Sequence, residues 1–110
     1  MSNRQPIRRA YQLTLRPDGL DQYIYWHDNI WPELIDKLKE SGIATVTLFV
    51  NPPIVFLYSE IMDEIAWDQV WESDLHKRWA AEIMDPLMHY DENRVLASIP
   101  LPEIWHFESK

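Results

Sequence analysis

The sequence predicts an α+β fold, in which an antiparallel β-sheet carries two helices on one face and the elements follow the order β-α-β-β-α-β. Two segments place apolar residues at the spacing of a helix, and the segments around them alternate or gather β-branched and aromatic residues as strands do. Turn signals containing Pro or Gly separate most of these segments. We expect a single domain over residues 1–110, because a second compact domain would need a longer chain.

The first half of the chain predicts a strand followed by a broken helix. Polar and apolar side chains alternate over residues 8–15, which is the period of a strand. Residues 20–40 have apolar side chains at helical spacing, so we expect a helix there. Pro32 lies inside this segment, removes a backbone donor and disfavours helix at the residue before it. The helix is therefore expected to break over residues 28–31.

The middle of the chain predicts a hairpin and a second helix. Residues 45–50 and 54–61 are rich in β-branched and aromatic residues, and a pair of prolines joins them. Residues 63–84 then return to helical spacing, and a polar interruption is expected at residues 72–74. These segments supply the central ββα of the predicted order.

The C-terminal part predicts a loop and a last strand. Residues 85–102 are polar and contain proline, so we expect an irregular loop; residues 101–108 alternate and predict a strand. The complete order is that of the ferredoxin-like split βαβ pattern. Helices on one face leave the other sheet face uncovered, so we expect a second subunit to cover it, as in a homodimer of the dimeric α/β-barrel type.

Composition and charge exclude several classes of partner. The formal net charge is −8 and the Lys and Arg residues form no dense stripe, which argues against nucleic acid and anionic membrane surfaces. The absence of Cys excludes disulfides and thiolate chemistry. The N-terminus is polar, and no apolar run approaches the roughly 20 residues of a membrane span. We expect a cytoplasmic protein.

The densest candidate for chemistry lies in the first predicted helix. Tyr23 and His27 are four residues apart, so their side chains are neighbours on one helix face. A phenol beside a neutral imidazole offers a proton donor and a proton acceptor together. The pattern alone favours the simpler interpretation, in which the two side chains are polar tips at the edge of the core. A metal site is not predicted, because no pair of the four His residues has the spacing of a zinc motif.

Two stretches resemble a known family. The segment YIYWHDNIWPELIDKLKESG at residues 23–42 is similar to the signature of L-rhamnose mutarotases, with a Tyr, a His four residues later, and then Asn-Ile-Trp-Pro-Glu-Leu. The segment WDQVWESDLHKRWAAEIMD at residues 67–85 resembles the second block of that family. The resemblance spans nearly the whole chain, roughly residues 9–107, and the predicted strand order agrees with it. It implies a small homodimeric βαββαβ enzyme that needs no cofactor.

The resemblance also assigns roles to individual residues. It implies that His27 is the catalytic residue and that Tyr23 and Trp79 contact the sugar. Two positions depart from the family: Ala80 replaces the second Trp of a Trp-Trp pair, and Val46 corresponds to a substrate-contacting Tyr. Both changes remove bulk. The expected substrate is therefore a 6-deoxyhexopyranose, either L-rhamnose or, in the reshaped pocket, L-fucose.

The expected reaction is interconversion of α and β anomers by general acid–base ring opening and closure, with His27 as the main proton donor and acceptor. Trp31 is a candidate wall of the sugar pocket or a core residue, and His106 is a candidate second acid–base group or a structural residue. Two alternatives stay open. One is a small oxygenase or haem-handling protein on the same dimeric fold, because fold alone does not decide function. The other is a sugar binder without catalysis.

Overall fold

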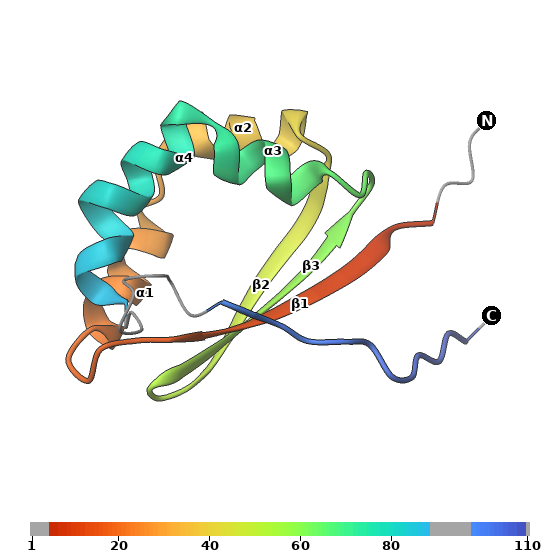
Figure 1. Ribbon diagram of the computed structural model, residues 1–110, viewed down its shortest axis with the longest axis horizontal. Helices are drawn as coiled ribbons and strands as arrows, with labels where there is room; N and C mark the ends of the chain where they lie inside the picture. The colour runs from red at the N-terminus through yellow and green to blue at the C-terminus, as the bar shows by residue number, and fades with distance from the viewer. Residues whose placement is uncertain (1–4, 89–97, 110) are drawn as a thin grey trace.

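A four-stranded antiparallel sheet forms one layer of the protein, and the helices form the other. The computed structural model describes residues 5–88 and 98–109. The sheet has the order β2-β3-β1-β4, and every paired strand runs antiparallel to its neighbour. Figure 1 shows the helices gathered on one side of this sheet and the other side bare. The strands are β1 (Ile7–Thr14), β2 (Ile43–Asn51), β3 (Ile54–Ile61) and β4 (Ile99–Pro100).

The first predicted helix is broken where the sequence placed the break. Its two parts are α1 (Leu20–Asp28) and α2 (Pro32–Glu40). Trp31 has the extended backbone, φ −58° and ψ 128°, that a residue before proline adopts. Pro32 occupies the first helical position of α2, where its missing N–H costs no hydrogen bond. The prediction for this segment is confirmed.

The second predicted helix is also divided. Its parts are α3 (Ala66–Glu72), α4 (Asp74–Trp79), a π-helical turn (Ala80–Met84) and a 3₁₀ turn (Asp85–Leu87). Ser73 separates α3 from α4 in an extended conformation with ψ 145°. Its Oγ accepts a hydrogen bond from the backbone N–H of His76 at 3.2 Å and donates one to the Val70 carbonyl at 2.6 Å. The interruption predicted at residues 72–74 is therefore a helix cap.

The predicted hairpin is confirmed, and its register decides which side chains face the helices. The turn contains Pro52 and Pro53, and β2 pairs with β3 residue by residue from Val46 opposite Ser59 to Asn51 opposite Ile54. Paired residues of an antiparallel sheet share a face. The row that crosses the sheet through Leu48, Leu57 and Tyr11 faces the helices, and the next row faces outward. That outward row consists of Phe49, Phe56, Gln12 and Ile99.

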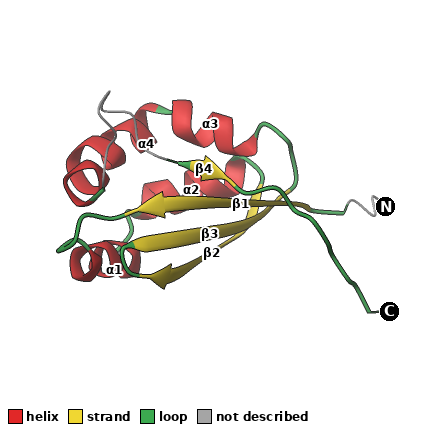
Figure 2. Cartoon of the chain, turned by 60° about the horizontal axis from the view of Figure 1, so that its bottom comes forward, coloured by secondary structure: helices red, strands yellow, loops and turns green. Residues whose placement is uncertain are grey.

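The last strand was predicted at the wrong residues. The structure has β4 at Ile99–Pro100, where it pairs with β1, and residues 101–109 form no strand. Leu101 still donates a backbone hydrogen bond to the Ala10 carbonyl at 2.9 Å. Beyond it the segment leaves the sheet and runs into solvent, as Figure 2 shows. The alternating pattern indicated extended backbone correctly, but a strand also needs a paired neighbour. Of the loop predicted over residues 85–102, residues 89–97 lie outside the described part.

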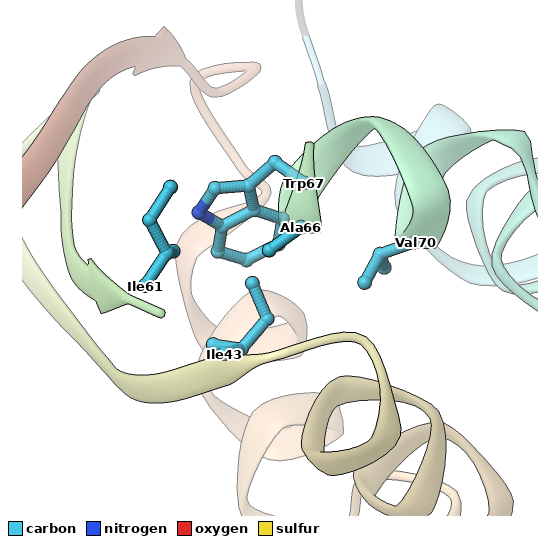
Figure 3. Close-up of a cluster of buried hydrophobic side chains, with 5 residues drawn as sticks. All are labelled: Ile43, Ile61, Ala66, Trp67 and Val70. Carbon is cyan, nitrogen blue, oxygen red and sulfur yellow. The ribbon is translucent and has the colours of Figure 1, made fainter. Parts of the chain in front are cut away.

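Two clusters of buried side chains form the core. The first joins β2, β3 and α3 and is drawn in Figure 3. In this cluster the Trp67 indole N–H donates a buried hydrogen bond to the Ser59 hydroxyl at 2.8 Å. The members of the first cluster are Ile43, Ile61, Ala66, Trp67 and Val70, and those of the second are Leu15, Tyr23, Val55 and Met88. Within the described residues, no helix is long and apolar enough to cross a membrane.

Candidate active site

A cavity of about 770 Å³ lies between the sheet and the helices. Its floor is the helix-facing side of the strands, including Tyr11, Leu48 and Leu57, and its walls come from all four helices. Apolar and aromatic side chains dominate the lining, and a few polar groups interrupt it. This composition is typical of a site that holds a small organic molecule by apolar contact and orients it with a few hydrogen bonds.

Tyr23 and His27 lie together on the wall formed by α1. Their ring centroids are 4.4 Å apart. His27 Nδ1 lies 2.8 Å from the backbone carbonyl oxygen of Tyr23, one helical turn earlier. A carbonyl oxygen can only accept, so Nδ1 carries a hydrogen and donates it. In the neutral imidazole this leaves the lone pair on Nε2, which is the nitrogen free to take a proton from a ligand.

Burial keeps this pair uncharged near neutral pH. It lowers the pKa of His27 from its ordinary 6.5, against smaller opposing effects of the Tyr23 carbonyl and the Asp28 carboxylate. It also raises the pKa of Tyr23 to about 12. The imidazole is therefore available as a base, while the phenol stays protonated and can donate a hydrogen bond.

Trp79, on α4, packs against the wall that carries Tyr23 and His27. It is only 3% exposed, and it lines the cavity. Its ring meets His27 edge to face with centroids 6.1 Å apart, and it meets Trp31 in the same way at 5.1 Å. Trp31 is not among the residues that line the cavity; it packs behind Trp79, under the Arg78 guanidinium at 5.1 Å. Of its two predicted roles, the packing role agrees with this position.

The two positions that the sequence analysis expects to depart from the family both line the cavity. Val46 reaches it from β2, and Ala80 reaches it from the start of the π-helical turn. Their small side chains leave space where larger ones would fill the cavity. The structure does not bring His106 to this site: it is exposed in the segment after β4 and is not part of the lining. Its predicted place in the cavity depended on a strand over residues 101–108, and the structure has its last described strand at Ile99–Pro100 instead.

His76 is a cavity residue that the sequence analysis did not single out. It lies on α4 and lines the same cavity as His27. Helical spacing could have found it, because His76 precedes Trp79 by three residues and Ala80 by four. Within the described part of the chain, no three His, Asp or Glu side chains are grouped so as to hold a metal ion.

Comparisons with known proteins point to one family. A family model described as L-rhamnose mutarotase matches residues 8–107. The L-rhamnose mutarotase of Tolumonas auensis is 35% identical over 89 residues, which are 79% of this chain and 86% of that protein. A crystal structure of the L-rhamnose mutarotase from Formosa agariphila has a TM-score of 0.78 at 25% identity and covers 93% of this chain and 99% of that one. An antibiotic biosynthesis monooxygenase, at 17% identity and a TM-score of 0.59 over 88% of this chain and 97% of its own, shares the fold alone.

Proposed function

The chain belongs to the L-rhamnose mutarotase family, and we propose on this basis that it interconverts the α and β anomers of L-rhamnose. One observation carries the proposal: an imidazole with a free Nε2 lines an aromatic cavity and is neutral near pH 7. The enzyme is then an isomerase whose chemistry is proton transfer. The alternative of an oxygenase or haem-handling protein is not favoured, because its support is the shared fold.

The proposed reaction opens and closes the pyranose ring. His27 Nε2 takes the proton of the anomeric hydroxyl while the ring oxygen gains a proton, and the bond between C1 and the ring oxygen breaks. The free aldehyde turns about the C1–C2 bond, and closure on its other face returns both protons and gives the other anomer. Each direction is general acid–base catalysis, which contributes about 10² to 10⁴-fold to a rate.

Tyr23 and Trp79 are proposed to hold the sugar. The neutral Tyr23 hydroxyl can donate a hydrogen bond to a sugar oxygen, and the Trp79 ring gives an apolar surface for the C–H side of the pyranose. Val46 and Leu48 offer an apolar place for the C6 methyl group of a deoxy sugar. The small side chains of Val46 and Ala80 make L-fucose a second candidate substrate.

The test is NMR saturation transfer between the anomeric protons of L-rhamnose and of L-fucose, with catalytic amounts of protein. We expect faster exchange for at least one of them. L-Mannose and L-galactose are matched controls, because they differ from these two sugars only by a hydroxyl at C6; slower exchange with them would support the apolar methyl site. Binding without faster exchange would instead support a sugar binder that lacks catalysis.

We also propose that two copies of the chain assemble through the bare face of the sheet. Phe49 is 59% exposed on this face, in the outward row with Phe56 and Ile99. In the segment after β4, Trp105 is 78% exposed and Phe107 is 69% exposed, and their rings stack on each other. An apolar surface of this kind is typical of a subunit interface. A second copy would cover it without closing the cavity on the opposite face.

Light scattering coupled to size exclusion tests the assembly. We expect twice the 13.2 kDa mass of one chain. Phe49→Glu would bury a charge against the partner and should shift the mass toward one chain. Ile24→Glu, at a comparably exposed position on α1, is the matched control and should leave the mass unchanged. A single-chain mass for the unaltered protein at micromolar concentration would contradict the proposal.

A further inference from the structure

The contacts of His27 leave one half of the reaction without a proton donor. Ring opening removes a proton from the anomeric hydroxyl and adds one to the ring oxygen. His27 Nδ1 already donates to the Tyr23 carbonyl, so only Nε2 can exchange a proton with the sugar. A single nitrogen cannot take the first proton and deliver the second in the same step. A concerted ring opening therefore needs a second proton-transfer group at the sugar.

Five titratable or charged side chains other than His27 line the cavity. Two are phenols, and Tyr23 is a poor acid because burial raises its pKa to about 12. Asp85 has an interaction of its own within the chain. Lys77 is exposed, so its ammonium group is hydrated. His76 is the group whose ordinary pKa lies close to neutrality, and burial lowers that pKa from 6.5. The five are Tyr11, Tyr23, His76, Lys77 and Asp85.

The position of His76 suits a partner of His27 across a bound sugar. It lies three residues before Trp79 on α4, and residues at this spacing are neighbours on a helix surface. Trp79 also meets the His27 ring, at 6.1 Å between centroids. Both imidazoles line the same cavity, His27 from α1 and His76 from α4, next to the ring proposed to carry the pyranose. Ala80, four residues after His76, adds little bulk beside it.

Two further observations favour a ligand contact over a structural role. The ring of His76 has no hydrogen-bond partner among the side chains and backbone of residues 5–88 and 98–109. Its backbone is fixed instead, because its N–H donates to the Ser73 Oγ that caps α4. The helix therefore holds the ring at the cavity while leaving its nitrogens available.

We propose that His76 is the second acid–base residue, so that His27 and His76 act at the two oxygens bonded to C1. The proposal rests on the mutarotase function proposed above. In ring opening one neutral imidazole takes the proton of the anomeric hydroxyl, and the other, as imidazolium, gives a proton to the ring oxygen. Closure returns both protons, so the enzyme is unchanged. The active form carries one proton between the two imidazoles, and because burial lowers both pKa values it is most populated on the acid side of pH 6.5.

The test compares the wild type with His76→Gln, which keeps a polar side chain of similar size but cannot transfer a proton near neutral pH. Saturation transfer at several concentrations of the better substrate gives kcat and KM. We expect kcat to fall about 10²-fold with KM changed much less. The wild-type rate should pass through a maximum with pH, because the active form carries one proton. In the variant only His27 can transfer a proton. Its rate should still fall at low pH, where His27 becomes protonated, but should no longer fall at high pH.

Glu82→Gln is the matched control, because Glu82 is exposed six residues further along the same helical segment and does not line the cavity. It should leave kcat, KM and the pH profile unchanged. A His76→Gln variant with wild-type kcat would overturn the proposal, and so would a lower kcat with both limbs of the profile intact. Absence of exchange in the wild type would overturn the mutarotase function and this proposal with it.

Discussion

Replacing His27 with alanine is expected to reduce the enzyme-accelerated exchange of anomers by about 10² to 10⁴-fold, the usual contribution of a general acid–base group. The substitution removes Nε2, the nitrogen available to the anomeric hydroxyl, while Tyr23 and Trp79 continue to line the cavity. KM should therefore change less than kcat. Saturation transfer between the anomeric protons measures both. Added imidazole should restore part of the rate, because it can enter the space left by the side chain.

Gln22→Ala is the control for this variant, since Gln22 is an exposed residue on the same helix and does not line the cavity. The pH profile provides a second check. Burial lowers the pKa of His27, so the base stays neutral to a pH below its ordinary 6.5. The wild-type rate should therefore fall with decreasing pH only below pH 6.5. Full activity in His27→Ala would refute the mechanism while leaving the family membership intact.

Replacing Trp67 with alanine is expected to cost about 3–5 kcal/mol in the free energy of unfolding, as large-to-small changes of buried aromatic residues do. Trp67 is 6% exposed, stacks on Trp71 at 5.4 Å and packs with Ile43 and Ile61 (Figure 3). Its removal also leaves the buried Ser59 hydroxyl without this donor. Small domains are stable by only about 5–15 kcal/mol, so this single change should bring the protein close to unfolding. Chemical denaturation monitored by circular dichroism measures the loss.

Trp67→Phe separates the contribution of ring packing from that of the hydrogen bond to Ser59. It keeps most of the ring packing and removes the indole N–H, so the expected loss is about 1–3 kcal/mol. Gln69→Ala, at an exposed position on α3, is the matched control and should change stability by less than about 0.5 kcal/mol. An equal loss for the phenylalanine and alanine variants would contradict the importance of the ring packing.

The sequence was sufficient for the elements whose causes are local. Pro32 disfavours helix at the residue before it wherever the segment lies, so the division between α1 and α2 was predictable. The hairpin and the break at Ser73 follow equally from short-range patterns. The prediction of the last strand was wrong because its cause is not local. Alternation at residues 101–108 indicates extended backbone, but pairing depends on whether another strand lies alongside, and the described sheet ends its pairing at Pro100.

In the site, too, local sequence determines some of the neighbours and tertiary packing determines the others. Tyr23 and His27 are four residues apart on one helix, so their proximity, and with it the family signature, could be read from the sequence alone. Tertiary packing decided which distant residues join them. It brought Trp79 against His27, moved Trp31 behind that ring, left His106 in solvent and turned His76 toward the cavity. Local spacing fixes neighbours within one element, whereas the neighbours of a cavity are fixed by how separate helices pack on the sheet.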